Sequence, residues 1–260
     1  MFRRLCLLLL LALGGCLGYI VWPPDVPGLL HHNPSTTSLI QLREKQAAQA
    51  GKKLHKEMVW RDLRHISPYL VHAVILAEDD TFYRHNGFDL EQIQIAFHRD
   101  WEKKKFVYGG STLTQQLART LYLSPNKNLL RKAKEAAITL ELEHFLSKNR
   151  ILELYLNVAE WGRGIYGAEA AARHYYGKPA EDLTPDEAVS LASILPSPRR
   201  WSPLSEKAFM ARRRSQLTER LQRAGYFPVT LNPAASPDLP PVDTPEDLQG
   251  EEHTPPPAPY

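Results

Sequence analysis

Apolar residues recur along most of the chain at the spacing of an α-helix. The segment that starts at Ser67, with a serine followed by a proline, has a typical helix start and predicts a helix to about residue 80. Val71, Val74 and Ile75 share one face of this helix, and Glu78 follows on the same face at i+7. The pattern predicts that Glu78 lies on the side of the helix that becomes buried.

The same period predicts further helices, separated by breaks at proline and glycine. Thr184 opens one of them as a capping box with proline at the first helical position, and Gly177 is a typical residue to end another. Because no run of alternating strands appears, the predicted fold class is mainly α. The further helices are predicted over residues 39–55, 90–101, 112–123, 129–146, 148–159, 168–176, 184–195 and 207–224.

The helix predicted over residues 129–146 has a distinct apolar side. Leu130, Ala133, Ala137 and Leu140 share one face at helical spacing.

An uncharged segment, Leu5 to Trp22, follows a pair of arginines near the N-terminus. Its length is at the lower limit of a transmembrane helix, and the arginines predict that the N-terminus stays inside. A cleaved signal peptide and a lipoprotein signal ending at Cys16 are the alternatives. All three send the rest of the chain across a membrane, which argues against a nucleic-acid partner.

Charge and composition divide the chain into four parts. All 32 Lys and Arg residues lie at or before Arg223, whereas six of the 29 acidic residues lie after it. The body is therefore basic, which suggests anionic partners. Both cysteines, Cys6 and Cys16, precede it, so no disulfide or cysteine metal site is predicted within it. The predicted parts are a membrane anchor at 1–22, a Pro-rich stalk or linker at 23–59, a folded domain at 60–224 and a disordered, acidic, Pro-rich tail at 225–260.

Three groups of polar residues are candidates for one site. The first is Glu78 and Asp79, followed by Phe82 and His85. Carboxylates at a helix C-terminus oppose the helix dipole, and a partly buried glutamate is typical of a catalytic acid or base. A solvated helix end is the alternative interpretation.

The second group opens the helix predicted at 112–123. Glycine backbone, hydroxyl groups and amides at a helix start suit a sugar or phosphate oxygen. The group lacks the Gly-Lys-Ser/Thr sequence of a P-loop, which argues against a nucleotide, and an ordinary polar helix start is the alternative. It comprises Gly110, Ser111, Thr112, Gln115 and Gln116 and ends at Arg119.

The third group lies around the start of the helix at 129–146. Arg131 and Glu135 are four residues apart, which is most often a solvated ion pair. Several cations near a helix N-terminus also oppose the dipole, and a bound polyanion would explain that arrangement. The group comprises Lys127, Arg131, Lys132, Lys134 and Glu135.

These groups and two later stretches form five short motifs: Glu78-Asp79-x-x-Phe82-x-x-His85-x-Gly87, Gly110-Ser111-Thr112-Leu113-Thr114-Gln115-Gln116-Leu117, Arg131-Lys132-x-x-Glu135, Ile151-Leu152-Glu153-x-Tyr155-Leu156-Asn157 and Leu183-Thr184-x-x-Glu187-Ala188-x-x-Leu191-Ala192 to Pro196. In order and spacing they resemble the motifs of the peptidoglycan glycosyltransferases, over about residues 60–205. The likeness is to the monofunctional biosynthetic type, because too few residues follow for a penicillin-binding domain. The implied fold is a lysozyme-like α-helical glycosyltransferase domain with an N-terminal transmembrane helix.

The resemblance implies that the chain polymerises lipid II, the lipid-linked disaccharide-peptide precursor, into β-1,4 glycan strands. By the family pattern Glu78 is the general base, Glu135 is the second catalytic carboxylate, and a lipid pyrophosphate is displaced with inversion. Arg119 stands where many relatives have lysine, which keeps the charge but changes the hydrogen-bond geometry. The implied substrate-binding residues are Asp79, Phe82, His85, Gly110, Ser111, Thr112, Gln115, Gln116, Arg119, Lys127, Arg131, Lys132, Lys134, Tyr155 and Asn157.

The resemblance also implies where the protein works and what it contacts. No cofactor is required and no metal ligand is assigned, although a divalent cation (Mg or Mn) at the pyrophosphate is left open. The expected partners are lipid II, the growing glycan strand and membrane lipids, with cell-wall synthases left open. The expected location is the bacterial cytoplasmic (inner) membrane, crossed once, with the catalytic domain on the periplasmic side and a mobile membrane-embedded lobe at about 88–108.

Two other functions compete with this one. A lysozyme-type hydrolase would share the carboxylate and the glycan but would have no use for the cations at Lys127 and Arg131. A non-catalytic membrane-anchored scaffold or glycan-binding protein would have no use for the base at Glu78.

Overall fold

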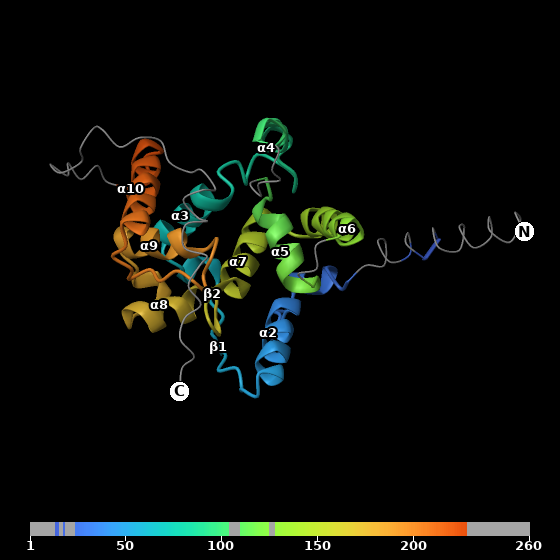
Figure 1. Ribbon diagram of the computed structural model, residues 1–260, viewed down its shortest axis with the longest axis horizontal. Coiled ribbons are helices and arrows are strands. Elements are labelled where there is room, and N and C mark those ends of the chain that lie inside the picture. The colour runs from blue at the N-terminus through green and yellow to red at the C-terminus, as the bar shows by residue number, and fades with distance from the viewer. Residues whose placement is uncertain (1–13, 16–17, 19–23, 104–109, 125–127, 228–260) are drawn as a thin grey trace, which may run out of the picture. The chain divides into compact units, whose positions relative to one another are not determined.

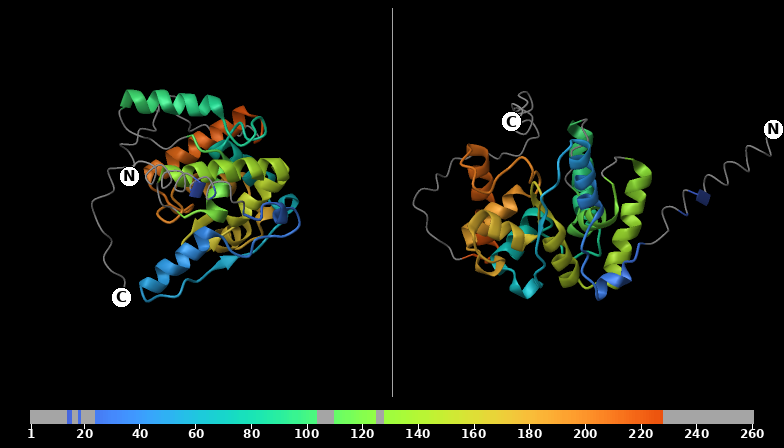
Figure 2. Two further views of the ribbon diagram at one scale, coloured as in Figure 1. Left: turned by 90° about the vertical axis from the view of Figure 1, so that its right-hand side faces the viewer. Right: turned by 90° about the horizontal axis from the view of Figure 1, so that it is seen from below.

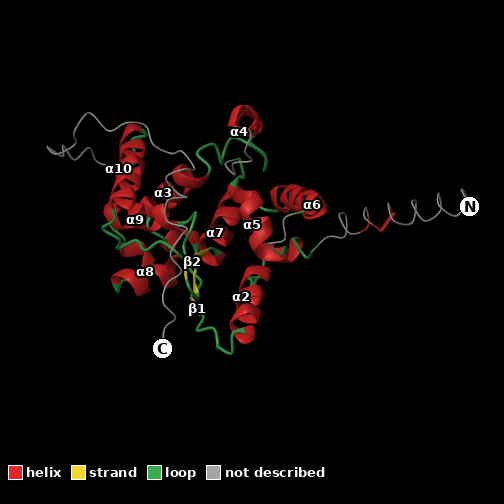
Figure 3. Ribbon diagram, viewed as in Figure 1, coloured by secondary structure: helices red, strands yellow, loops and turns green. Residues whose placement is uncertain are grey.

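Helices make up most of the described chain, as the periodicity predicts (Figures 1 and 3). The computed structural model describes residues 14–15, 18, 24–103, 110–124 and 128–227. The chain divides into a larger unit, Met1–Leu90 with Ser111–Pro228, and a smaller one, Glu91–Gly110 with Val229–Tyr260. The larger unit contains η1 (Pro27–Leu30), α2 (Ser38–Gln49), β1 (Glu57–Met58), η2 (Leu63–His65), α3 (Pro68–Glu78), α5 (Leu113–Tyr122), α6 (Leu129–Phe145), α7 (Lys148–Val158), β2 (Glu160–Gly162), β3 (Ile165–Tyr166), α8 (Ala168–Tyr176), η3 (Ala180–Asp182), α9 (Pro185–Ile194) and α10 (Ala208–Arg223), whereas α4 (Leu90–Lys103) lies almost wholly in the smaller unit.

Helix α7 forms the centre of the larger unit. From Ile151 to Val158 all of its residues are buried except Glu153, so α7 is apolar almost all round, as a central helix must be. Helix α7 contacts α5, α6 and α8 (Figures 1 and 2). Helix α3 packs against α9 and α10, and α5 packs against α2 and α6. Two of the helices that carry candidate residues, α5 and α6, therefore contact α7 directly.

Helix α3 buries a face next to the predicted one. Leu70, Ala73 and Val74 are buried, whereas Ile75 and Glu78 are half-buried. The predicted face is thus correct for Val74, but the buried face is rotated from it by part of a turn. The reason is that α9 and α10 cover the side of α3 that carries Leu70 and Ala73. Ser67 is the N-cap residue as predicted, but its hydroxyl donates to Leu183 O at 2.9 Å and not to its own helix.

The buried face of α6 carries a charged residue. Leu130 and Leu140 are exposed, and the buried residues are Glu135, Ile138, Thr139 and Leu142. Hydropathy alone cannot identify this face, because the charge of Glu135 is compensated by cations of neighbouring turns.

Much of the segment predicted as a stalk packs into the larger unit. Val26, Leu29 and Ile40 are buried, and α2 contacts α5. Arg43 of α2 donates to Glu160 Oε2 through Nη2 at 2.8 Å. Residues 24–58 are therefore part of the fold around the site and not a free linker.

A small sheet of order β1-β3-β2 joins this segment to the loop after α7. β1 pairs parallel with β3, and β2 pairs antiparallel with it. Gly164 has a φ of +83° and lies so close to the chain that a Cβ would come within 2.1 Å of His55 O. Strands of two or three residues are too short to show an alternating pattern, so they could not be predicted from the sequence.

Almost all of the predicted anchor and residues 228–260 of the predicted tail lie outside the described residues. Within the described ranges, no helix combines the length and apolar character that crossing a membrane requires. The described start of the tail is packed, because Phe227 is buried and meets the Tyr69 ring edge-on at 5.4 Å between centroids.

Glu169 of α8 provides a test of the core. Its side chain has no exposed surface and accepts hydrogen bonds from Arg61 Nη2 at 2.9 Å, Arg173 Nε at 2.6 Å and Ala180 N at 2.8 Å. Burial by itself would raise the pKa of Glu169, but these donors outweigh it and lower the pKa. We expect Glu169→Ala to lower the free energy of unfolding by about 2–4 kcal/mol in chemical denaturation, because a buried amide and two guanidinium groups lose their acceptor.

Glu181 is the matched control for this change. It is exposed and lies in η3, close in sequence to Ala180. Glu181→Ala should change stability by less than about 0.5 kcal/mol. Equal effects of the two substitutions would contradict the structural role given to Glu169.

Candidate active site

Glu78 is the last residue of α3, and its carboxylate meets α5 and α7. Gln116 of α5 donates from Nε2 to Glu78 Oε2 at 2.9 Å. The Gln116 amide oxygen in turn accepts from the hydroxyl of Tyr155 of α7 at 3.2 Å. Three helices far apart in sequence thus fix the position of this one carboxylate.

The surroundings of Glu78 favour a proton-accepting role. Burial raises its pKa, and the neighbouring Asp79 adds to that effect. The hydrogen bond from Gln116 and the charges of Arg213 and Arg119 lower the pKa but do not cancel the effect of burial. A raised pKa makes the ionised carboxylate a stronger base than an exposed glutamate.

Asp79 joins the end of α3 to the beginning of α5. Its Oδ2 accepts from Leu113 N, the first residue of α5, at 2.8 Å, and its Oδ1 lies 2.9 Å from His85 Nε2. Burial raises the pKa of Asp79, opposed by its bonds to His85 and to the Leu113 amide. The carboxylate therefore lies at the positive end of the α5 dipole, which favours its ionised form.

The start of α5 is held by a capping box. Thr112 Oγ1 accepts from Gln115 N at 3.2 Å, and Gln115 Oε1 accepts from Thr112 N at 3.1 Å. The Thr112 hydroxyl also donates to Gly87 O at 2.7 Å, which ties the first two motifs together again. Gly87 has a φ of +84°, and a Cβ there would meet Thr139 Cγ2 at 2.7 Å. Thr112 and Gln115 are buried, so the structure places them in the support of the site.

Glu135 gathers the cations of the third motif. Its side chain is completely buried, with Arg131 Nη1 at 2.6 Å, Arg119 Nη1 at 3.9 Å and Lys132 Nζ also in contact. Arg119 comes from α5 and the other two cations from α6, so Glu135 holds positive charge from two helices in one place. Arg119 also acts on the pKa of Glu78, which makes it the link between the two carboxylates.

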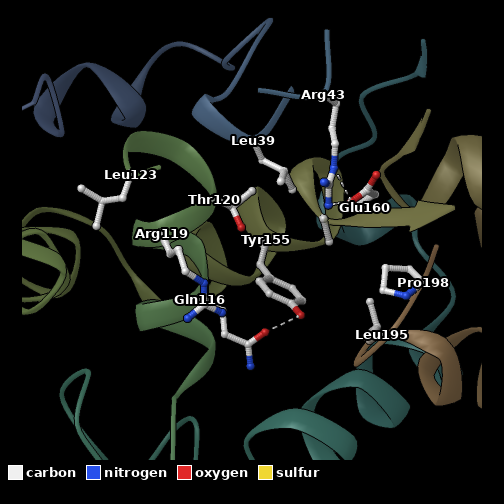
Figure 4. Close-up of a pocket in the computed structure, with 11 residues that line it drawn as sticks. Leu39, Arg43, Gln116, Arg119, Thr120, Leu123, Tyr155, Glu160, Leu195 and Pro198 are labelled. Atoms are coloured by element: carbon white, nitrogen blue, oxygen red, sulfur yellow. Dashed lines mark hydrogen bonds and ion pairs between the residues drawn. The ribbon is translucent and has the colours of Figure 1, made fainter. Parts of the chain in front are cut away.

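A cavity of about 200 Å³ opens beside Gln116, Arg119 and Tyr155 (Figure 4). On its other side Arg43 is paired with Glu160. The remaining lining is largely apolar and includes Leu39 of α2. The cavity therefore lies against the residue that links the two carboxylates, and α2 forms part of its wall.

The other predicted site residues fall into different places. Phe82 has no exposed surface, and Lys148 Nζ lies 4.5 Å from its ring centroid. Asn157 is buried and binds Arg61 N and O, each at 2.8 Å. Ser111 is half-buried, and its carbonyl accepts from Gln116 Nε2 at 3.4 Å.

Three more residues of the prediction need separate mention. Lys134 is half-buried on α6. Gly110 belongs to the smaller unit, and Lys127 lies outside the described residues. For all of these residues, contact with a substrate stays a prediction.

Sequence reasoning missed two contributions to the site. Arg213 of α10 acts on Glu78, donates from Nε to Ser193 O at 2.9 Å and lies over the Trp201 ring. Glu143 Oε1 accepts hydrogen bonds from Thr114 Oγ1 at 2.5 Å and from Lys148 Nζ at 2.8 Å. The sequence showed that the helix of Arg213 is basic, but no local pattern identifies which arginine turns toward a residue of α3.

A metal site is not evident among these side chains. Within the described ranges, no three His, Cys, Asp or Glu side chains converge so as to hold an ion. Glu135 already has cationic partners on both oxygens.

The chain shares its sequence with a known family of proteins. The sequence profile described as Transglycosylase matches residues 43–222, from α2 to α10. The chain is 42% identical over 244 residues to the "Biosynthetic peptidoglycan transglycosylase" of Alcanivorax borkumensis, covering 92% of this chain and 96% of the relative. It is 52% identical over 173 residues to the protein of that name from Aromatoleum aromaticum, covering 66% of this chain and 74% of the relative. It is 49% identical over 170 residues to the protein of the same name from Azoarcus sp., covering 65% of this chain and 74% of the relative.

Removing the Asp79 carboxylate should loosen the junction of α3 and α5. In Asp79→Ala the buried Leu113 amide loses its acceptor, so the free energy of unfolding should fall by about 1–3 kcal/mol. Amide hydrogen exchange at the start of α5 should accelerate more than in the rest of the core. Asp80→Ala is the control: Asp80 is exposed and meets Arg220 Nη2 only at 3.4 Å, so its loss should change stability by less than about 0.5 kcal/mol. Unchanged exchange in Asp79→Ala would contradict the role given to this carboxylate.

Proposed function

The chain belongs to the transglycosylase family, and we propose that it is a peptidoglycan glycosyltransferase that polymerises lipid II into β-1,4 glycan strands. The observation that carries the proposal is the arrangement of two unlike carboxylates around Arg119. Glu78 is a carboxylate with a raised pKa, and Glu135 is a carboxylate surrounded by cations. Glycosyl transfer from a pyrophosphate requires both a base and a cationic site for the leaving group.

Glu78 acts as the general base in this proposal. As the acceptor sugar hydroxyl attacks the anomeric carbon of the donor, its proton passes to Glu78. A new C–O bond forms while the bond from the anomeric carbon to the pyrophosphate oxygen breaks, and the electron pair leaves with the pyrophosphate. This single displacement inverts the configuration and needs no covalent enzyme intermediate.

The cations around Glu135 bind the leaving pyrophosphate. Because Glu135 has no exposed surface, its role is to hold Arg119, Arg131 and Lys132 in place, so it is a positioning residue. The family pattern adds Lys127 and Lys134 to this group. Fixed positive charge stabilises the developing anion without reorganisation during the reaction.

A divalent cation has no protein site in this proposal. The Glu135 oxygens are occupied by Arg131 and Lys132, and Glu78 is assigned to the proton. An Mg or Mn ion would have to be held by the pyrophosphate itself, so no step is derived through it.

We also propose that the protein is anchored in the bacterial cytoplasmic membrane. The support is the uncharged run from Leu5 to Trp22, preceded by two arginines. This orientation places the folded body on the outer side, where the lipid-linked precursor is used. Cell-wall synthases remain an open set of partners.

The direct test is to incubate detergent-solubilised full-length protein with lipid II and to separate the products by glycan length. The wild type should produce long glycan. Glu78→Gln keeps the size and hydrogen-bonding capacity of the side chain but cannot accept the proton, so the rate should fall by about 10²–10⁴-fold.

The same assay separates the competing functions. A hydrolase would shorten added glycan without lengthening it, and a scaffold would give equal product with Glu78→Gln. Absence of polymer from the wild type, or equal polymer from both proteins, would overturn the proposal.

The pH dependence of polymerisation should report the pKa of Glu78. Because that pKa is raised and the base must be ionised, activity should fall on the acid side at a pH above the usual range for glutamate. Gln116→Ala removes a donor that favours the ionised form, so it should move the acid limb to higher pH. Tyr155→Phe removes the hydroxyl that donates to Gln116 but keeps the hydrogen bond from Gln116 to Glu78. It should therefore move the acid limb of the pH profile less than Gln116→Ala does. A limb that is identical in all three proteins would contradict this assignment.

A further inference from the structure

Arg213 of α10 is a fixed cation that acts on Glu78 without an ion pair of its own. Its Nε donates to Ser193 O at 2.9 Å, and its Cζ lies 5.4 Å from the centroid of the Trp201 ring. Ser193 belongs to the last turn of α9, where the carbonyl groups lack helical partners and carry the negative end of the dipole. Among the described residues, no carboxylate comes within ion-pair distance of Arg213, so its charge remains available to act on Glu78.

Contacts along α3 hold α10 in place. Arg220 Nη2 lies 3.4 Å from Asp80 Oδ2, just beyond the end of α3. After the end of α10, the Tyr226 ring stacks on His72, in the first half of α3, at 4.0 Å between centroids. The two helices therefore run in opposite directions, and the Arg213 end of α10 lies toward the C-terminal end of α3, where the base is.

The charged and polar groups that act on Glu78 come from four helices. Helix α9 also packs against α3, but its acidic residues are confined to its first turn. The groups are Asp79 of α3, Gln116 and Arg119 of α5, Tyr155 of α7 and Arg213 of α10. Arg119 and Arg213 are the two cations of this set, and Arg119 also lies 3.9 Å from Glu135.

The two cations should respond differently when an anion binds. Under the proposed function, Arg119 is one of the cations around Glu135 that receive the leaving pyrophosphate. A bound pyrophosphate neutralises those cations and adds negative charge on the Arg119 side of Glu78, which favours the protonated carboxyl. Arg213 lies outside that group and keeps its charge, and a substrate that excludes water strengthens its action on Glu78.

We propose that Arg213 is a positioning residue that keeps Glu78 ionised while a pyrophosphate group occupies the cations around Glu135. The inference rests on the proposed function, because it assumes that Glu78 accepts the proton and that those cations bind the pyrophosphate. It assigns separate tasks to the two arginines: Arg119 serves the leaving group, and Arg213 serves the base.

The first experiment measures the ionisation of Glu78 without catalysis. A carbodiimide modifies protonated carboxyl groups, so the pH at which labelling of Glu78 is half-maximal, read by peptide mass spectrometry, reports its protonation. Detergent-solubilised full-length protein is labelled with and without inorganic pyrophosphate. With pyrophosphate present, Arg213→Gln should raise this midpoint by about half a pH unit to one unit above that of the wild type.

Two further variants complete this experiment. Arg213→Lys keeps the positive charge and should raise the midpoint less than Arg213→Gln does. Arg212→Gln removes a neighbouring, exposed arginine and should leave the midpoint unchanged. Equal midpoints for the wild type and Arg213→Gln in pyrophosphate would overturn the proposal. A midpoint that pyrophosphate leaves unchanged in both proteins would also overturn it, because the cations around Glu135 would then not influence the base.

The second experiment uses the pH dependence of polymerisation. The acid limb of kcat reports the enzyme–substrate complex, whereas that of kcat/KM reports the free enzyme. Arg213→Gln should move the limb of kcat to higher pH, which lowers kcat about three- to tenfold on that limb, and should move the limb of kcat/KM less. Arg213→Lys should restore most of the shift, and Arg212→Gln should move neither limb.

A merely structural role of Arg213 would give a different result. It would lower kcat at every pH without moving the limb, and that outcome would contradict the proposal. Absence of polymer from the wild type would count against the proposed function instead, while the labelling midpoint would still decide whether Arg213 keeps Glu78 ionised.

Discussion

The Asp79 carboxylate is the constraint on which the site depends. As the C-cap residue of α3, Asp79 lies at the unfavourable end of that helix dipole, but it also caps the favourable end of α5 by accepting from Leu113 N. One charge therefore fixes two helices that are separated by more than thirty residues in sequence. Glu78 and Gln116 then lie within hydrogen-bond distance because the helices that carry them are joined one turn away.

Glu135 solves a similar problem at the start of α6. Cations in the first turns of a helix oppose its dipole, and a buried carboxylate without partners would be very unfavourable. The cations and the carboxylate compensate each other: Arg131 and Lys132 neutralise the charge of Glu135, and Arg119 of α5 adds a third positive charge. The buried charge decides which face of α6 turns inward, and the leucines on the other face remain outside.

This compensation also explains what the sequence could predict. The site residues taken from motif order stay a prediction, whereas helix positions and the caps at Thr184 and Gly177 followed from period and cap residues. The buried face of α6 did not, because an apolar stripe normally indicates the core and the partners of Glu135 act through space. The packing of residues 24–58 was missed for the same reason: its contacts, such as Arg43 with Glu160, join positions more than a hundred residues apart.

The two glutamates differ in how fully their charge is compensated, and that difference separates their roles. Glu135 is surrounded by cations in contact, so its charge orders its neighbours. Glu78 is half-buried with a neutral amide as its hydrogen-bond donor, and Arg119 and Arg213 act on its pKa without cancelling the effect of burial. A carboxylate can serve as a base only while part of its desolvation remains uncompensated. In the proposed mechanism, stronger pairing of Arg119 with Glu78 would weaken the base and would also withdraw positive charge from the leaving group. Under that proposal, Arg119 affects both halves of the reaction.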